Sequence, residues 1–93
     1  MDRTAFETEL REQGYGEVVD RRMEADAFNP EHAHEFDACL LVLEGAMTIT
    51  SEGEQRTYRA GDTFSMSAGC RHAEQSGPEG TRYLAGRRYP KNG

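Results

Sequence analysis

Short extended segments separated by glycine-containing turns are the feature that most constrains the fold of this chain. The sequence has 93 residues and ten glycines, and apolar side chains alternate with polar ones in several of the intervals between glycines. A period of two is typical of β-strands. The segments that we expect to form strands are residues 17–25, 40–43, 46–50, 55–59, 63–66, 71–75 and 81–89. Strands this short, joined by such closely spaced turns, indicate an antiparallel sandwich or barrel.

One short helix is expected before the strands, over residues 5–13. Thr4 and Glu7 fit a capping box, in which each side chain bonds to a backbone amide of the first turn. Phe6 and Leu10 are four residues apart and therefore share one face of the helix. An isolated helix of this length is marginal in water, so we expect it to pack as a cover on the sheet.

Several turns have identifiable residues. We expect residues 28–30 and 76–80 to form a turn and a loop, because they contain proline and glycine. We expect positive φ angles or close strand contacts at Gly45 and Gly61. Asp62 is expected to cap a turn through its carboxylate rather than to act as a catalytic base.

Length and composition predict one small domain. Residues 1–16 are expected to be a helical cover, residues 17–89 the barrel and residues 90–93 a tail. No stretch approaches the ~18 consecutive apolar residues that cross a bilayer. The N-terminus lacks the basic and then apolar layout of a signal peptide, so we expect a cytoplasmic protein with Cys39 and Cys70 as reduced thiols.

Charge is distributed unevenly along the chain. The formal net charge of −6 argues against a nucleic-acid or anionic-membrane partner. Residues 1–54 hold 14 acids and 4 arginines, whereas residues 55–93 hold 3 acids and 7 bases. We expect these halves to face each other within one barrel or across a homodimer, in which a second copy also covers exposed strand surface.

The three histidines are placed as metal ligands would be. His32 and His34 are two residues apart, so they point the same way in an extended chain, and His72 follows a later turn. Imidazole is the commonest metal ligand near neutral pH. Three neutral imidazoles suit Zn, Fe, Ni or Cu rather than Mg or Ca.

The spacing around His32 and His34 resembles the first motif of the cupin superfamily. That motif has His-x-His, three or four residues, Glu, six residues and Gly, and here it matches His32, His34 and Gly45. Ala38 occupies the place of the motif glutamate.

The second cupin motif is matched in part. It has Gly, five residues, Pro-x-Gly, two residues, His, three residues and Asn, and here it matches Gly61, Gly69 and His72. Ser67 and Ser76 stand where the family has Pro and Asn.

The resemblance covers residues 17–89 and implies an all-β fold, the antiparallel cupin or jelly-roll β-barrel. In metal-binding cupins the histidines that correspond to His32, His34 and His72 coordinate a divalent cation. The resemblance therefore implies a divalent transition metal at these three residues.

The missing glutamate leaves the fourth metal ligand open. Glu74 ranks first, because it lies two residues beyond His72 and so shares its strand face. Cys39 ranks second, and its thiolate would favour a soft ion. Water completing a three-histidine site is an equal alternative. The side chains that we expect to line the pocket are Cys39, Met47, Tyr58, Phe64, Met66 and Tyr83.

Two functional hypotheses follow, and the sequence identifies neither a substrate nor catalytic residues. The first is a small metal-dependent enzyme, such as a dioxygenase, isomerase or lyase, that binds a small polar molecule at open positions of the ion. The second is a non-catalytic ligand-binding or sensing cupin without metal. Fold alone does not decide between them.

Overall fold

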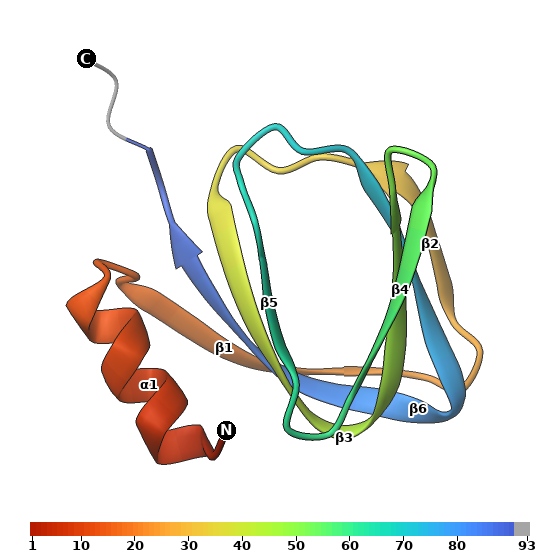
Figure 1. Ribbon diagram of the computed structural model, residues 1–93, viewed down its shortest axis with the longest axis horizontal. Coiled ribbons are helices and arrows are strands. Elements are labelled where there is room, and N and C mark those ends of the chain that lie inside the picture. Colours follow the sequence, from red (N-terminus) through yellow and green to blue (C-terminus); the bar gives the residue numbers. More distant parts are fainter. Residues whose placement is uncertain (91–93) are drawn as a thin grey trace.

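The computed structural model describes residues 1–90, which form one helix and six strands. In chain order these are α1 (Arg3–Glu12), β1 (Glu17–Met23), β2 (Phe28–His32), β3 (Asp37–Ser51), β4 (Glu54–Arg59), β5 (Thr63–Met66) and β6 (His72–Arg88) (Figure 1). The expected tail lies outside the described residues from position 91 onward.

The two long strands, β3 and β6, organise the sheet. They pair antiparallel along most of their lengths, while β1 and β2 pair with the other edge of β6 and β4 and β5 pair with the other edge of β3. Both long strands curve, so the sheet curls round on itself (Figure 1). Among the described strands no pairing closes the sheet into a complete barrel. The fold is the all-β antiparallel jelly roll that the sequence predicts, with its edges left open.

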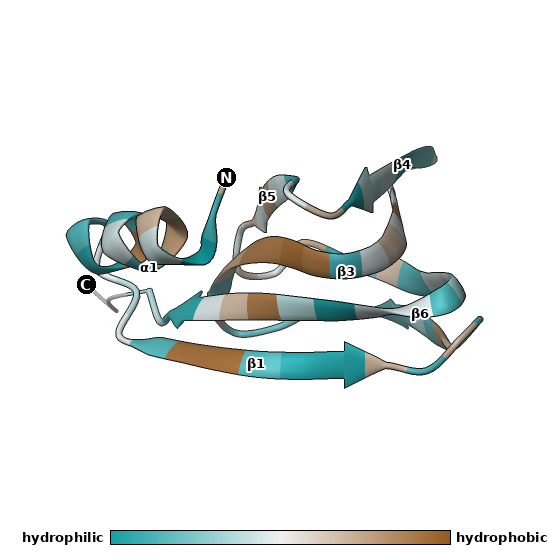
Figure 2. Cartoon of the chain, turned by 90° about the horizontal axis from the view of Figure 1, so that it is seen from below, coloured by the Kyte–Doolittle hydropathy of each residue, from teal (hydrophilic) through white to brown (hydrophobic). Residues whose placement is uncertain are grey.

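Alternation along β3 separates two apolar clusters, because neighbouring side chains on a strand point to opposite faces. Figure 2 shows that the first half of β3 is the most hydrophobic part of this strand. The outer cluster, under α1, consists of Phe6, Leu10, Tyr15, Leu41 and Leu84. The inner cluster, enclosed by the curled sheet, consists of Ala38, Leu40, Met47, Ile49 and Ala85.

Helix α1 covers the sheet as expected, but its cap differs from the prediction. Phe6 and Leu10 are each 1% exposed and belong to the outer cluster. The N-cap is Asp2, whose Oδ1 accepts a hydrogen bond of 2.8 Å from the amide of Ala5. The capping box at Thr4 is therefore wrong: Asp2 offers a charged acceptor two residues earlier, so the helix begins at Arg3.

Two expected breaks in the sheet are strands instead. The residues of the expected turn at 28–30 belong to β2, because the chain reverses earlier, at Asp26, which has a φ of 58°. The expected loop at 76–80 lies within β6. It stays in the sheet because Gly45 of β3 has no Cβ and lets the backbone of β6 at Gly80 pass very close.

The other turn assignments are confirmed. Gly45 and Gly61 have φ angles of 77° and 94°. Asp62 Oδ2 accepts a hydrogen bond of 2.8 Å from the amide of Arg59, as a turn cap does. Across residues 1–90 we find no helix that combines the length and the apolar character needed to span a bilayer. The cytoplasmic location stays a prediction.

Candidate metal centre

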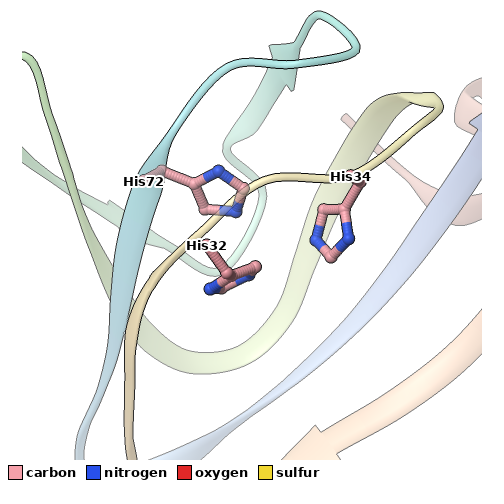
Figure 3. A group of neighbouring side chains, drawn as sticks. All are labelled: His32, His34 and His72. Carbon is pink, nitrogen blue, oxygen red and sulfur yellow. The ribbon is translucent and has the colours of Figure 1, made fainter.

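The structure brings the three histidines together at one end of the curled sheet. His32 is the last residue of β2 and His72 is the first of β6, and the two are register partners. His34 lies in the segment between β2 and β3. Figure 3 shows the three rings gathered around one point. One potential ligand atom from each histidine lies within 4.8 Å of those of the other two.

Backbone contacts orient two of the rings. His32 Nδ1 lies 2.8 Å from the carbonyl oxygen of Pro30, and His72 Nδ1 lies 3.1 Å from that of Cys70. A ring nitrogen at this distance from a carbonyl donates its N–H, which leaves the lone pair on Nε2. Histidines that bind metal ions are commonly held in this way by a second contact.

His72 provides the clearest indication that the site binds something. The residue is 1% exposed, and its Nε2 is buried without a hydrogen-bond partner among the described residues. A buried polar atom without a partner costs free energy, about 1–3 kcal/mol. A metal ion accepts the lone pair of such a nitrogen, so the donor set and its burial fit a metal.

His34 is suited to the neutral form that a metal requires. Partial burial lowers its pKa, and the nearby His32 and His72 lower it further when they are charged. The ring stacks on Phe36 with centroids 4.7 Å apart and an angle of 16° between the planes. This contact fixes the position of an imidazole that lies outside any strand.

Two further contacts tie the turn before His72 to the segment that carries His34. The amide of Gly69 donates a hydrogen bond of 2.9 Å to the carbonyl of His34. The amide of Ala68 donates one of 2.8 Å to Asp37 Oδ1, while Arg88 donates to Asp37 Oδ2 at 3.0 Å. The Ala68 amide and then Arg88 hold the pKa of Asp37 below its ordinary value. Sequence analysis did not predict this positioning role of Asp37.

Glu74 lies beside the histidines, on the same strand face as His72. Its Oε1 is 3.6 Å from His32 Nε2 and accepts a hydrogen bond of 3.1 Å from Asn29 Nδ2. Its side chain is 11% exposed. Within the described residues, the group whose potential ligand atoms all lie within 4.8 Å of one another contains the three histidines and not Glu74. Ligation by Glu74 stays a hypothesis.

Cys39 is not part of the site. It packs against the outer cluster under α1, where burial raises the pKa of its thiol. Its neighbour Ala38 belongs to the inner cluster and lines the pocket beside the histidines. Because adjacent residues of a strand face opposite ways, the expectation that Cys39 lines the pocket is wrong.

A pocket of about 440 Å³ opens next to the histidines. Two of the expected lining residues, Met66 and Tyr83, contribute to it. Met47 does not, because it is fully buried in the inner cluster. Tyr58 and Phe64 stack on each other with centroids 4.2 Å apart and line a separate groove between β4 and β5. Met47 therefore fills the core, and Tyr58 and Phe64 line the neighbouring groove and not the pocket beside the histidines.

The pocket also contains residues that sequence analysis missed. Among them are Arg21, Asn29, Phe36 and Arg87. The sequence could have indicated the two arginines, because Arg21 shares a strand face with Val19 and Met23, and Arg87 shares one with Tyr83 and Ala85.

The chain belongs to the cupin family, because the family model described as Cupin domain matches residues 20–84. Solved structures agree. A protein of unknown function from Rhizobium leguminosarum has a TM-score of 0.73 and 23% identity, over 80% of this chain and 69% of that one. KdgF from Halomonas sp. has a TM-score of 0.64 and 27% identity, over 76% of this chain and 67% of that one. A variant of oxalate decarboxylase from Bacillus subtilis has a TM-score of 0.70 and 21% identity, over 77% of this chain and 20% of that one. No curated protein matches the chain.

Proposed function

We propose that this cupin binds one divalent transition-metal ion, Zn, Fe, Ni or Cu, through His32, His34 and His72. The observation that carries the proposal is the unpartnered, buried Nε2 of His72, which lies in a group of three imidazoles whose ligand atoms are within 4.8 Å of one another. An all-imidazole donor set suits these borderline ions and disfavours Mg and Ca.

The pocket beside the histidines is proposed to bind a small polar molecule. A bound ion with open positions would supply Lewis acidity there. The chain's own residues would orient the molecule, since Asn29 holds Glu74 next to His32 and Tyr83 lines the same pocket. Glu74 is thereby placed to accept a hydrogen bond or a proton from a bound molecule, or to act as a fourth ligand.

Elemental analysis of protein purified without added metal tests the proposal. We expect about one equivalent of a transition metal in the wild type, or stoichiometric uptake of Zn²⁺ by the metal-free protein. His34→Ala should lose this binding. Glu35→Gln is the matched control, because Glu35 is an exposed neighbour in the same segment.

A wild type that neither carries metal nor binds Zn²⁺ at micromolar concentration would refute the metal site. That result would favour the alternative, a ligand-binding or sensing cupin whose histidines line an organic-ligand pocket. Far-ultraviolet circular dichroism of each variant separates a lost ligand from a lost fold.

A further inference from the structure

The wall of the pocket formed by β1 and β6 is basic. Arg21 of β1 and Tyr83 of β6 are register partners in an antiparallel pair, so their side chains lie next to each other on one face. Arg87 follows Tyr83 by four residues and therefore shares this face of β6. All three side chains line the pocket that also contains His32 and His34.

The Arg87 guanidinium is positioned by packing on an aromatic ring and not by hydrogen bonds from its N–H groups. Its guanidinium carbon lies 4.7 Å from the centroid of the Phe36 ring, and Phe36 in turn stacks on His34. A guanidinium that stacks on an aromatic ring keeps the N–H groups in its own plane free for other partners. The nearest carboxylate, that of Glu17, is 3.7 Å away, which is too far for a hydrogen bond. Within residues 1–90 the Arg87 side chain donates none.

The other arginines of β6 differ in this respect. Arg88 and Arg82 point to the outer side of the sheet, and both donate hydrogen bonds to carboxylates, of Asp37 and of Asp20. Arg21, on the pocket side, has neither an ion pair nor a side-chain hydrogen bond within the described residues. On β6, therefore, the arginine without a hydrogen-bonded counter-ion is the one that faces the pocket.

The two acidic groups of the pocket already have partners. Glu74 accepts from Asn29 and lies beside His32, and Glu31 forms an ion pair of 2.6 Å with Arg71. The lining also includes apolar side chains, Leu40, Met66 and Ala85 among them. This layout matches a small molecule that has an anionic end, a short carbon chain and a polar end.

We propose that the pocket binds a small organic carboxylate, with its carboxylate held by Arg87 and Arg21 and with a hydrogen bond from the Tyr83 hydroxyl. Arginine is well suited to this role, because its N–H groups match the geometry of a carboxylate in pairs. Burial and the negative charge of Glu74 raise the pKa of Tyr83, so its hydroxyl remains a donor at neutral pH. That the far end of the molecule meets a metal rests on the proposed function, whereas the carboxylate contact does not.

Isothermal titration calorimetry with acetate, propionate, butyrate and valerate tests the proposal, with the amide of each acid as a neutral probe of the same shape. We expect at least one of the acids to bind the wild type at least tenfold more tightly than its amide. Arg87→Gln and Arg21→Gln should weaken that binding by roughly 10- to 100-fold each, the size of a lost charge-assisted hydrogen bond.

Arg22→Gln is the matched control. Arg22 is the neighbour of Arg21 on β1, carries the same charge and faces the opposite side of the sheet. Its replacement should change carboxylate affinity by less than about twofold. The proposal is overturned if no acid is preferred to its amide, if both Arg21→Gln and Arg87→Gln bind as the wild type does, or if Arg22→Gln weakens binding as much as they do.

Zn²⁺ titration of the same variants separates this proposal from the metal site. Intact Zn²⁺ binding without carboxylate binding refutes the proposed carboxylate site and retains the proposed metal site. Carboxylate binding in a His34→Ala protein that has lost Zn²⁺ supports the basic wall on its own. If Arg87→Gln fails to fold, the carboxylate affinity of Arg21→Gln tests the proposal alone. Arg21 is exposed on an edge strand, so its replacement should leave the fold intact.

Discussion

Replacing Gly45 by alanine should destabilise the fold far more than replacing a glycine of similar backbone conformation in open space. At Gly45 the φ angle is +77°, and a Cβ would lie 1.9 Å from the carbonyl oxygen of Gly80. At Gly53 the φ angle is +81°, but apart from its chain neighbours no described residue has an atom within 4 Å of the Cβ position. Both changes incur the penalty of a left-handed conformation, roughly 1–2 kcal/mol. Gly45→Ala also forces two paired strands apart, which adds about 1–3 kcal/mol as overpacking does.

Urea unfolding followed by circular dichroism measures this difference. We expect Gly53→Ala to lose roughly 1–2 kcal/mol of unfolding free energy and Gly45→Ala roughly 2–5 kcal/mol. For a domain of this size, about 1 kcal/mol corresponds to a shift of about 4–8 °C in Tm. Gly61→Ala extends the series, because its Cβ would meet only the N-terminal nitrogen at 3.9 Å. Equal losses for all three variants would refute the reasoning, since the backbone conformation alone would then account for the effect.

Three other predictions concern the site and the assembly. Cys39→Ser should leave Zn²⁺ affinity unchanged, because Cys39 packs under α1. Glu74→Gln should weaken Zn²⁺ affinity only if Glu74 is the fourth ligand. An effect of Cys39→Ser equal to that of His34→Ala would contradict the geometry. Asp37→Asn should destabilise the protein at pH 7, and this difference from the wild type should disappear in acid. The pKa of Asp37 is depressed in the folded state, so the stabilisation by its carboxylate is present above pH ~4 and is lost as pH falls through the lower folded pKa. Urea unfolding at several pH values measures the difference. The chain should form a homodimer, because Val18 and Phe28 are 39% and 58% exposed on strands that each pair with only one other described strand. A monomer mass from light scattering at low-micromolar concentration would argue against it.

The local features of the fold were predictable from sequence where the responsible residues are adjacent in the chain. Glu52 and Gly53 form the expected hairpin turn, with φ angles of 51° and 81°. The cap at Asp62 and the limits of β5 were correct for the same reason. The continuity of β6 was not predictable in this way. Proline and glycine at 76–80 are typical of a loop, and what keeps them in the sheet is the contact of Gly80 with Gly45, which is 35 residues away in the sequence.

The histidines were found by their spacing, but the pocket residues depended on which face of each strand turns inward. With Ala38 facing the pocket, the alternation of side chains along β3 would have placed Cys39 on the opposite face and so outside the pocket. The same alternation could not exclude Met47, Tyr58 or Phe64 from the pocket, because all three do point inward. The pocket ends where they pack, and that depends on how tightly β3, β4 and β5 curl.

The position of the site also depends on contacts that a motif does not encode. Asp37 and the carbonyl of His34 hold the turn at 68–69, and Arg88 holds Asp37 from the far end of β6. These contacts fix the approach of His72 to His34 from a different part of the chain. Ala38, in the place of the motif glutamate, adds no charge to this arrangement and leaves space in the pocket. Arg21, which has no ion pair within the described residues, and Arg87, which has only the 3.7 Å contact with Glu17, line the same pocket, so an alanine in place of a carboxylate beside three histidines favours an anionic ligand there.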